Sequence, residues 1–235
     1  MVYRSELKYF IDSNDLVILD GKLKNIMGLD STAKFKKYNV RSIYFDSYNN
    51  KCFYENEDGV NERFKIRIRI YNRSTNDIKL EIKYKKNGFA HKESVLIDKK
   101  MCEKLINGFK LNYKECNNTI LRKLYLEQQM HLFLPKIMVE YDRIAYVDKI
   151  GNTRVTFDTN IRASKYVKSF FDSPVYAKPI MPINMHILEI KYNELFPDYI
   201  AKQLQSVHIE RTSFSKYYLS RIAFKEEVLW ILMML

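Results

Sequence analysis

Basic and apolar residues alternate along one short segment, Arg63–Ile70, which reads RFKIRIRI. Successive side chains of a β-strand point to opposite faces, so a strand here carries four cations on one face and four apolar side chains on the other. Cations in a row repel one another, and water, carboxylates or a bound polyanion must offset that repulsion. A charged face in contact with solvent is the ordinary explanation for one such strand. Whether the charged face points outward or inward must therefore be judged from the other strands.

Faces that mix cations with carboxylates, opposite apolar faces, recur in other segments with the period of a strand. The members are Glu6 and Lys8 in Tyr3–Ile11, Glu81, Lys83 and Lys85 in Ile78–Lys86, Arg154 and Asp158 in Asn152–Asn160, and Glu189 and Lys191 in Ile183–Tyr192. In Lys136–Val147, Glu140 and Arg143 have opposite parity and share a face only across a β-bulge.

Two kinds of barrel can be built from these strands. Apolar faces turned inward give an ordinary core and a charged exterior. Charged faces turned inward give a polar tunnel whose apolar outside is covered by helices. The second arrangement explains the mixture of charges, because lysine and arginine form charge-assisted hydrogen bonds with phosphate oxygens and carboxylates hold a divalent metal that bridges the same phosphates. The pattern therefore favours a tunnel for phosphate compounds.

The remaining patterns predict the elements that position these side chains. We expect strands over Tyr3–Ile11, Asn39–Ser47, Asn61–Asn72, Ile78–Lys86, His91–Ile97, Lys136–Val147, Asn152–Asn160 and Ile183–Tyr192, with a hairpin turn at Asn87-Gly88. We expect helices that begin near Ser13 or Asn14, Lys99, Thr119, Asp198 and Ser213 or Ser215. The prediction is one α+β domain over residues 1–235, an antiparallel closed β-barrel with helices packed outside.

The net charge of +12 fits a polyanionic partner, although a solvated basic surface gives the same balance. The strand cations alternate with isoleucine and valine and not with exposed aromatic residues that would stack on bases, which argues against nucleic acid. No GxxxxGK[ST] phosphate loop is present, so ATP would have to bind through side chains.

Two features bear on the compartment. The three cysteines form no CxxC pair and the N-terminus lacks the apolar run of a signal peptide, so we expect a cytoplasmic protein. The apolar tail Val228–Leu235 is too short to span a bilayer. We expect it to be the buried end of a helix, with a membrane or partner contact as the alternative.

Taken in order, these segments resemble the triphosphate tunnel enzymes of the CYTH-like superfamily, and among them the polyphosphate polymerase domain of the vacuolar transporter chaperone (VTC) family. The motifs that carry the resemblance are Glu6–Tyr9, Arg67–Tyr71, Glu81–Lys83, Lys92–Val95, Tyr141–Tyr146, Arg154–Asp158, Leu188–Lys191 and Ser213–Tyr217. Each motif alone is weak, but their shared order covers almost the whole chain.

The resemblance implies a triphosphate tunnel fold and transfer of the γ-phosphate of ATP to a growing inorganic polyphosphate chain, with Mn²⁺ or Mg²⁺ as cofactor. The residues assigned to the reacting centre are Arg67, Arg69, Lys83 and Arg143; those assigned to further phosphate contacts are Lys8, Lys65, Lys85, Lys92, Arg154 and Lys216. Lys65 and Lys85 are assigned from strand parity alone and not from the resemblance. Glu189 is the metal ligand that the resemblance implies, and Glu6, Glu81 and Glu140 are added as helpers. One departure is Ser213, where the eukaryotic relatives have a lysine.

Two other functions fit the same lining. In a hydrolase of tripolyphosphate or nucleoside triphosphates, water would attack in place of an acceptor phosphate and a glutamate would serve as base. A polyphosphate-binding module would need the cations but no reaction.

Overall fold

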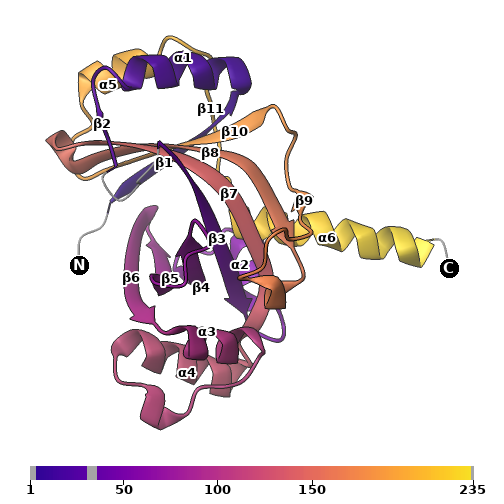
Figure 1. The fold of residues 1–235 in the computed structure, drawn as a ribbon. Coiled ribbons are helices and arrows are strands. Elements are labelled where there is room, and N and C mark those ends of the chain that lie inside the picture. Colours follow the sequence, from indigo (N-terminus) through magenta and orange to yellow (C-terminus); the bar gives the residue numbers. More distant parts are fainter. Residues whose placement is uncertain (1–3, 31–35, 234–235) are drawn as a thin grey trace.

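An antiparallel sheet of eleven strands forms the framework of the computed structural model, which describes residues 4–30 and 36–233 (Figure 1). The hydrogen-bonded order is β11-β1-β10-β8-β7-β3-β4-β5-β6, with β2 paired to β7 and β9 to β8. The strands are β1 (Ser5–Asp12), β2 (Gly28–Leu29), β3 (Lys37–Asp46), β4 (Arg63–Tyr71), β5 (Ile78–Lys86), β6 (Phe89–Ile97), β7 (Leu134–Asp148), β8 (Thr153–Ser164), β9 (Lys178–Pro179), β10 (Met185–Tyr192) and β11 (Glu210–Arg211). All eight expected strands are confirmed, and the three two-residue strands are too short to leave a sequence pattern.

The sheet curls until its two ends meet, but the expected closed barrel is joined at one point only. Arg4, just before β1, and Ala90 in β6 exchange two backbone hydrogen bonds of 3.3 and 3.4 Å. Farther along β1, the same edge is taken by β11, which pairs with Tyr9 and Phe10. The free edge of β1 is therefore divided between two partners, and no continuous ladder to β6 forms among the described residues.

Six α-helices pack outside the sheet in the described part of the chain. They are α1 (Ser13–Leu23), α2 (Lys51–Glu57), α3 (Lys99–Ile106), α4 (Thr119–His131), α5 (Asp198–Leu204) and α6 (Lys216–Met233). Side chains of Asp12, Asp98 and Asn118 accept hydrogen bonds from the first-turn N–H groups of α1, α3 and α4 and so cap them. Helix α1 thus begins at Ser13, as expected, with Asp12 as its cap, and the short helix α2 has no counterpart in the expectations.

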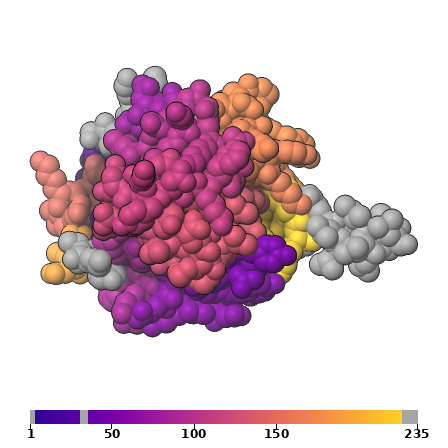
Figure 2. All heavy atoms as spheres, turned by 90° about the horizontal axis from the view of Figure 1, so that it is seen from below, coloured from indigo at the N-terminus to yellow at the C-terminus, as the bar shows by residue number. Residues whose placement is uncertain are grey.

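Apolar residues fill two layers between the helices and the outer surface of the sheet. One layer lies under α1 and α5 and includes Leu19, Leu23, Phe157 and Leu188; Figure 1 shows these two helices side by side above the sheet. The larger layer lies under the other helices, and the face seen from below is formed largely by the segment that contains α3 and α4 (Figure 2). The core therefore lies outside the barrel.

The charged strand faces point inward as a result. In β4, Ile66, Ile68 and Ile70 are fully buried in the larger apolar layer. Arg67 and Arg69 alternate with them and point into the interior. The tunnel arrangement, with apolar faces covered by helices, is therefore the one that forms.

The C-terminal helix α6 extends to Met233 and so continues into the apolar tail. The side chains of residues 226–235, on which the expected burial or partner contact of the tail depends, lie outside the described residues. Within the described part of the chain, no helix combines the length and the apolar character that crossing a bilayer requires.

The outer core predicts a clear contrast between two leucines. Leu23 on α1 is fully buried, whereas Leu126 on α4 is 49% exposed. Because a buried leucine leaves a cavity when truncated, Leu23→Ala should lower the free energy of unfolding by about 2–5 kcal/mol, and Leu126→Ala by less than about 1 kcal/mol. Urea denaturation measures both. Equal, small losses would contradict a core placed between α1 and the sheet.

Candidate functional site

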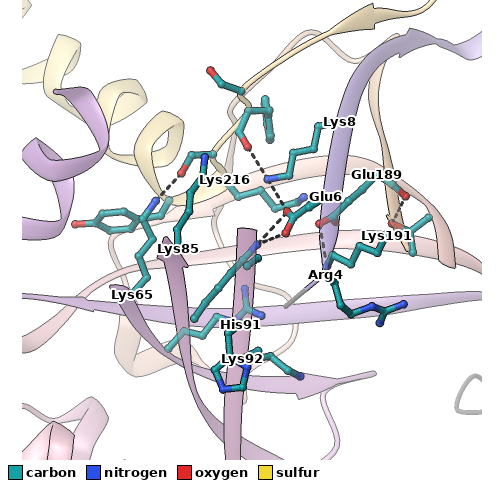
Figure 3. A pocket seen from close by; sticks show the side chains of 18 of the residues that line it. Arg4, Glu6, Lys8, Lys65, Lys85, His91, Lys92, Glu189, Lys191 and Lys216 are labelled. Atoms are coloured by element: carbon teal, nitrogen blue, oxygen red, sulfur yellow. Dashed lines mark hydrogen bonds and ion pairs between the residues drawn. The ribbon is translucent and has the colours of Figure 1, made fainter. Parts of the chain in front are cut away.

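The strands enclose a cavity of about 670 Å³ whose lining is dominated by lysine and arginine. Most expected site residues line it, and several of them are labelled in Figure 3. The lining cations are Arg4, Lys8, Arg63, Lys65, Arg67, Arg69, Lys83, Lys85, Lys92, Arg143, Arg154, Lys191 and Lys216. Among the described residues, two carboxylates face the same space, Glu6 and Glu189.

Glu81 on β5 contacts three of the lining cations but does not itself line the cavity. Its side chain is fully buried, and its carboxylate accepts hydrogen bonds of 2.7 Å from Arg67 Nε and 2.8 Å from Lys92 Nζ. Arg69 Nη1 lies 3.7 Å from the same carboxylate. Burial opposes ionisation, but the charge of Arg67 and then that of Arg69 keep the pKa of Glu81 far below its usual range. Glu81 does not line the cavity, and both its oxygens have cationic partners, so the geometry favours positioning of the cations over metal binding.

The second cluster alternates acids and bases across β1 and β10. The register places Glu6 opposite Lys191 and Lys8 opposite Glu189. Lys83 donates to both oxygens of Glu6, at 2.9 and 2.7 Å, and Lys191 Nζ lies 2.9 Å from Glu189. Burial raises the pKa of Glu6, but the charges of Lys83, Lys8 and Lys191 together outweigh it, and the pKa falls to about 2. The carboxylates are therefore ionised and poor proton acceptors at neutral pH.

A third buried acid, Asp158 on β8, was not assigned a role from the sequence. Arg143 binds it through two hydrogen bonds of 2.6 and 2.7 Å, and Lys216 Nζ lies 2.6 Å from it. Arg143 Nη2 also lies 3.4 Å from Glu189. Burial opposes ionisation of Asp158, yet Arg143 lowers its pKa. The sequence did indicate that Asp158 shares a strand face with Arg154. It does not reveal that Arg143 and Lys216 converge on Asp158.

Two tyrosines that were given no role from the sequence complete the orientation of the arginines. The hydroxyl of Tyr44 accepts a 3.2 Å hydrogen bond from Arg67, and that of Tyr141 accepts one of 3.2 Å from Arg69. Lys216 lies over the ring of Tyr141 at 4.7 Å. The position of Tyr44 on β3, two residues after the inward-facing Ser42, was the signal that could have identified it.

The cations at one side of the cavity lack such acidic partners. Lys65 Nζ donates to neutral oxygens, Asn56 Oδ1 at 2.6 Å and Ser215 Oγ at 2.9 Å. Burial, followed by the charges of Lys8 and Lys83, lowers the pKa of Lys65 to about 7. Figure 3 shows Lys65 and Lys85 on one side of Glu6, with Glu189, Lys191 and Arg4 on the other.

The remaining assigned residues also lie at the cavity. Arg154 pairs with Asp30 at 2.6 Å and donates to the hydroxyl of Tyr38. Lys8 donates to the carbonyl oxygen of Phe214 at 2.8 Å. Ser213, at the position where the eukaryotic relatives have a lysine, contributes to the lining.

The expected place of Glu140 in the tunnel is wrong. Glu140 is buried on the opposite face of β7, where Arg41 binds it at 2.6 Å and Arg162 at 2.8 Å. A register irregularity does occur between β7 and β8 next to Glu140, but Tyr141 and Arg143 keep the inward face. The bulge therefore does not carry Glu140 to the cavity, and its arginine partners fix it to the neighbouring strands.

The expected four-glutamate metal site reduces to one pair of carboxylates. Among the described residues, no three histidine, cysteine, aspartate or glutamate side chains converge as a metal centre would require. Glu6 and Glu189 both face the cavity and interact with one another. Mg²⁺ and similar ions are commonly held by one or two carboxylates together with substrate phosphates. The Glu6–Glu189 pair fits that mode of binding.

The comparisons with known proteins agree with this geometry. The model of the VTC domain family matches residues 3–224. Among solved structures, a putative adenylyl cyclase from Hippeastrum, described as having a dominant triphosphatase activity, aligns with a TM-score of 0.57 at 14% identity, over 95% of this chain and 96% of its own. A protein from Pyrococcus horikoshii aligns with a TM-score of 0.48 at 16% identity, over 95% of this chain and 99% of that one. No curated protein sequence matches the chain.

The fold is the expected triphosphate tunnel fold, in which an antiparallel sheet curls around a cation-lined cavity and helices pack outside. Among proteins of this fold, the chain belongs to the VTC domain family, as the match over residues 3–224 shows.

The buried position of Glu81 predicts a loss of stability when its charge is removed. Glu81→Gln leaves Arg67, Arg69 and Lys92 without their carboxylate, and breaking a buried pair in this way costs about 3–5 kcal/mol. Urea denaturation should show that loss. The matched control is Glu62→Gln, because Glu62 pairs with Lys86 at the surface and is 65% exposed; it should change stability by less than about 1 kcal/mol. Similar values for both variants would contradict the role of Glu81.

Proposed function

We propose that this protein is a polyphosphate polymerase, which transfers the γ-phosphate of ATP to the end of a growing inorganic polyphosphate chain inside the cavity. The observation that carries the proposal is the lining itself: cations on facing strands, oriented by buried Glu81 and Asp158, in a chain that belongs to the VTC domain family. Such an enclosure neutralises phosphate charge from several sides.

Phosphoryl transfer depends on alignment and charge stabilisation more than on covalent help from the protein. Arg67 and Arg69 on β4 face the same space as Arg143 on β7 and Lys216 on α6. Their guanidinium and ammonium groups would hold donor and acceptor phosphates in line and stabilise the charge that develops on the transferred group. Because Glu81, Asp158 and the two tyrosines fix the arginines beforehand, little reorganisation is needed on binding.

The acceptor in this reaction is a phosphate oxygen that already carries negative charge, so its attack requires no base. This suits the cavity, since the pKa of Glu6 is lowered to about 2 and that of Glu189 also lies well below its usual range. Burial opposes both shifts, but Lys83, Lys8 and Lys191 together outweigh it for Glu6, and Lys191, Lys8 and Arg143 together contribute the opposing charge for Glu189. Weakly basic carboxylates support transfer to phosphate over activation of water by the protein.

Glu6 and Glu189 are the residues that would hold a divalent metal, and Mn²⁺ or Mg²⁺ bound there would add positive charge next to the phosphates. Lys8, Lys83 and Lys191 already neutralise this pair. The same lysines line the cavity and would contact the phosphates beside this pair.

Hydrolysis of triphosphates is the second candidate, because the Hippeastrum protein that shares the fold is described by its triphosphatase activity. Product analysis separates the two. Purified protein is incubated with ATP and either Mn²⁺ or Mg²⁺, and ADP, free phosphate and polymer are measured. ADP with polymer is the expected result. ADP with an equivalent amount of free phosphate and no polymer would replace the polymerase with a hydrolase.

The same assay tests the arginine pair. Arg69→Gln removes a charge that faces the cavity and should lower kcat/KM for ATP at least about a hundredfold, about 2.7 kcal/mol of transition-state stabilisation. Lys149→Gln removes an equal charge from the exposed surface and should leave turnover within about twofold of the unsubstituted protein. Near-normal turnover in a folded Arg69→Gln protein would remove the reaction from this cavity.

The low pKa of Lys65 predicts a pH dependence of the binding of long-chain polyphosphate. In the free protein Lys65 is charged below about pH 7 and neutral above it. Bound phosphate favours the charged form, so binding takes up a proton and the contribution of Lys65 weakens by up to about tenfold per pH unit above pH 7.

Calorimetry in buffers of different ionisation enthalpy measures the proton uptake. Lys65→Arg stays charged across this range, so the difference in uptake between the two proteins cancels the titration of the ligand itself. Equal proton uptake by both proteins at pH 8 would exclude Lys65 as the titrating contact.

A further inference from the structure

The cavity has two electrostatically different parts. In the central part each pair of cations is matched by a buried acid: Arg67 and Lys92 by Glu81, and Arg143 and Lys216 by Asp158. At the start of β4 and the end of β5 the cations lack such partners. Arg63, Lys65 and Lys85 line this part of the cavity, which we refer to as the basic end.

Strand register opposes like charges at the basic end. Arg63 lies directly opposite Lys85, and Lys65 lies directly opposite Lys83. Like charges in directly opposed cross-strand positions are destabilising. The next pair on the same face of these strands, Arg67 and Glu81, has opposite charges. Of these four cations, Lys83 has an acid, Glu6. No ion pair to Arg63, Lys65 or Lys85 is formed within the residues that the structure describes.

The groups that do contact these cations are neutral. Lys65 donates to Asn56 and Ser215, Arg63 donates to the carbonyl oxygen of Val60, and Lys85 is exposed. The charge of Glu55 raises the pKa of Arg63, against the lowering by burial, but the two side chains form no ion pair. Only solvent or a bound ligand can therefore offset the repulsion among the cations of the basic end. A ligand that offsets it must be anionic.

The basic end lies beyond the central part of the cavity. At about 3.4 Å per residue, Arg63 is roughly 14 Å along β4 from Arg67. A short phosphate ligand held at Arg67 leaves Arg63 and Lys85 free, whereas a chain of phosphates that continues along the cavity passes them. None of the three residues belongs to the motifs that carry the family resemblance.

We propose that Arg63, Lys65 and Lys85 form a second phosphate subsite that binds the part of a polyphosphate chain lying beyond the reacting phosphates. The proposal rests on the proposed function and extends it, since it assigns a direction to the polymer: from the centre of the cavity toward the start of β4. The subsite selects for chain length, because its ligands are phosphates that a tripolyphosphate does not present there.

Binding to ligands of two lengths tests the subsite. The double variant Arg63→Gln/Lys85→Gln is compared with unsubstituted protein for tripolyphosphate and for long-chain polyphosphate, at one salt concentration, by calorimetry or fluorescence competition. The ratio of the two affinities should shift against the long chain by at least about tenfold, equivalent to about 1.4 kcal/mol. Both side chains reach solvent and lie outside the apolar layers, and thermal melting checks that the variant remains folded.

The matched control removes the same charge elsewhere. Lys149→Gln/Lys202→Gln lowers the net charge equally at two exposed positions away from the cavity and should leave the affinity ratio unchanged. An equal loss for both ligand lengths in the Arg63/Lys85 variant, or a ratio shift no larger than that of the control, would overturn the subsite. If the unsubstituted protein binds neither ligand, the proposed function fails; if it binds both and the ratio is unmoved, the subsite alone fails.

Discussion

The structure depends on keeping a layer of charge inside a barrel, where uncompensated cations are costly. Glu81 and Asp158, both fully buried, meet that constraint by holding Arg67, Lys92, Arg143 and Lys216 in defined positions. The acids lie behind the lining, so the cations keep their outer hydrogen-bonding groups for the cavity. The same ion pairs thus serve stability and pre-organisation, and a ligand that enters finds its partners already oriented.

Turning the charged faces inward moves the hydrophobic core outside. The apolar faces of the strands need cover, and α1 with α5 on one side and α2, α3, α4 and α6 on the others supply it. Figure 1 shows the helices around the sheet and not within it. The helices are therefore as necessary to the cavity as the strands, because without them the sheet would gain more by burying its apolar faces inside.

The charge inside the barrel is also unevenly distributed. The centre is neutralised by acids, the Glu6–Glu189 pair offers carboxylates to a cation, and the basic end has no acidic partner within the described residues. An extended polyanion can satisfy all three regions at once, whereas a small anion can satisfy only one. The closure of the barrel by a single bridge between Arg4 and Ala90 leaves this interior framed by strands on nearly every side.

The sequence by itself determined the strands, the parity of their faces and the identity of most lining cations, because alternation along a strand is a local property that survives in any packing. It indicated Arg67, Arg69, Lys83 and Lys8 for that reason. Tertiary structure decided what local pattern could not. The bulge beside Glu140 left that residue outside, Tyr44 and Tyr141 proved to orient arginines, and Asp158 gained Arg143 and Lys216 from distant elements. These outcomes depend on which strands are neighbours and in what register, and sheet order is set by packing between segments far apart in the chain.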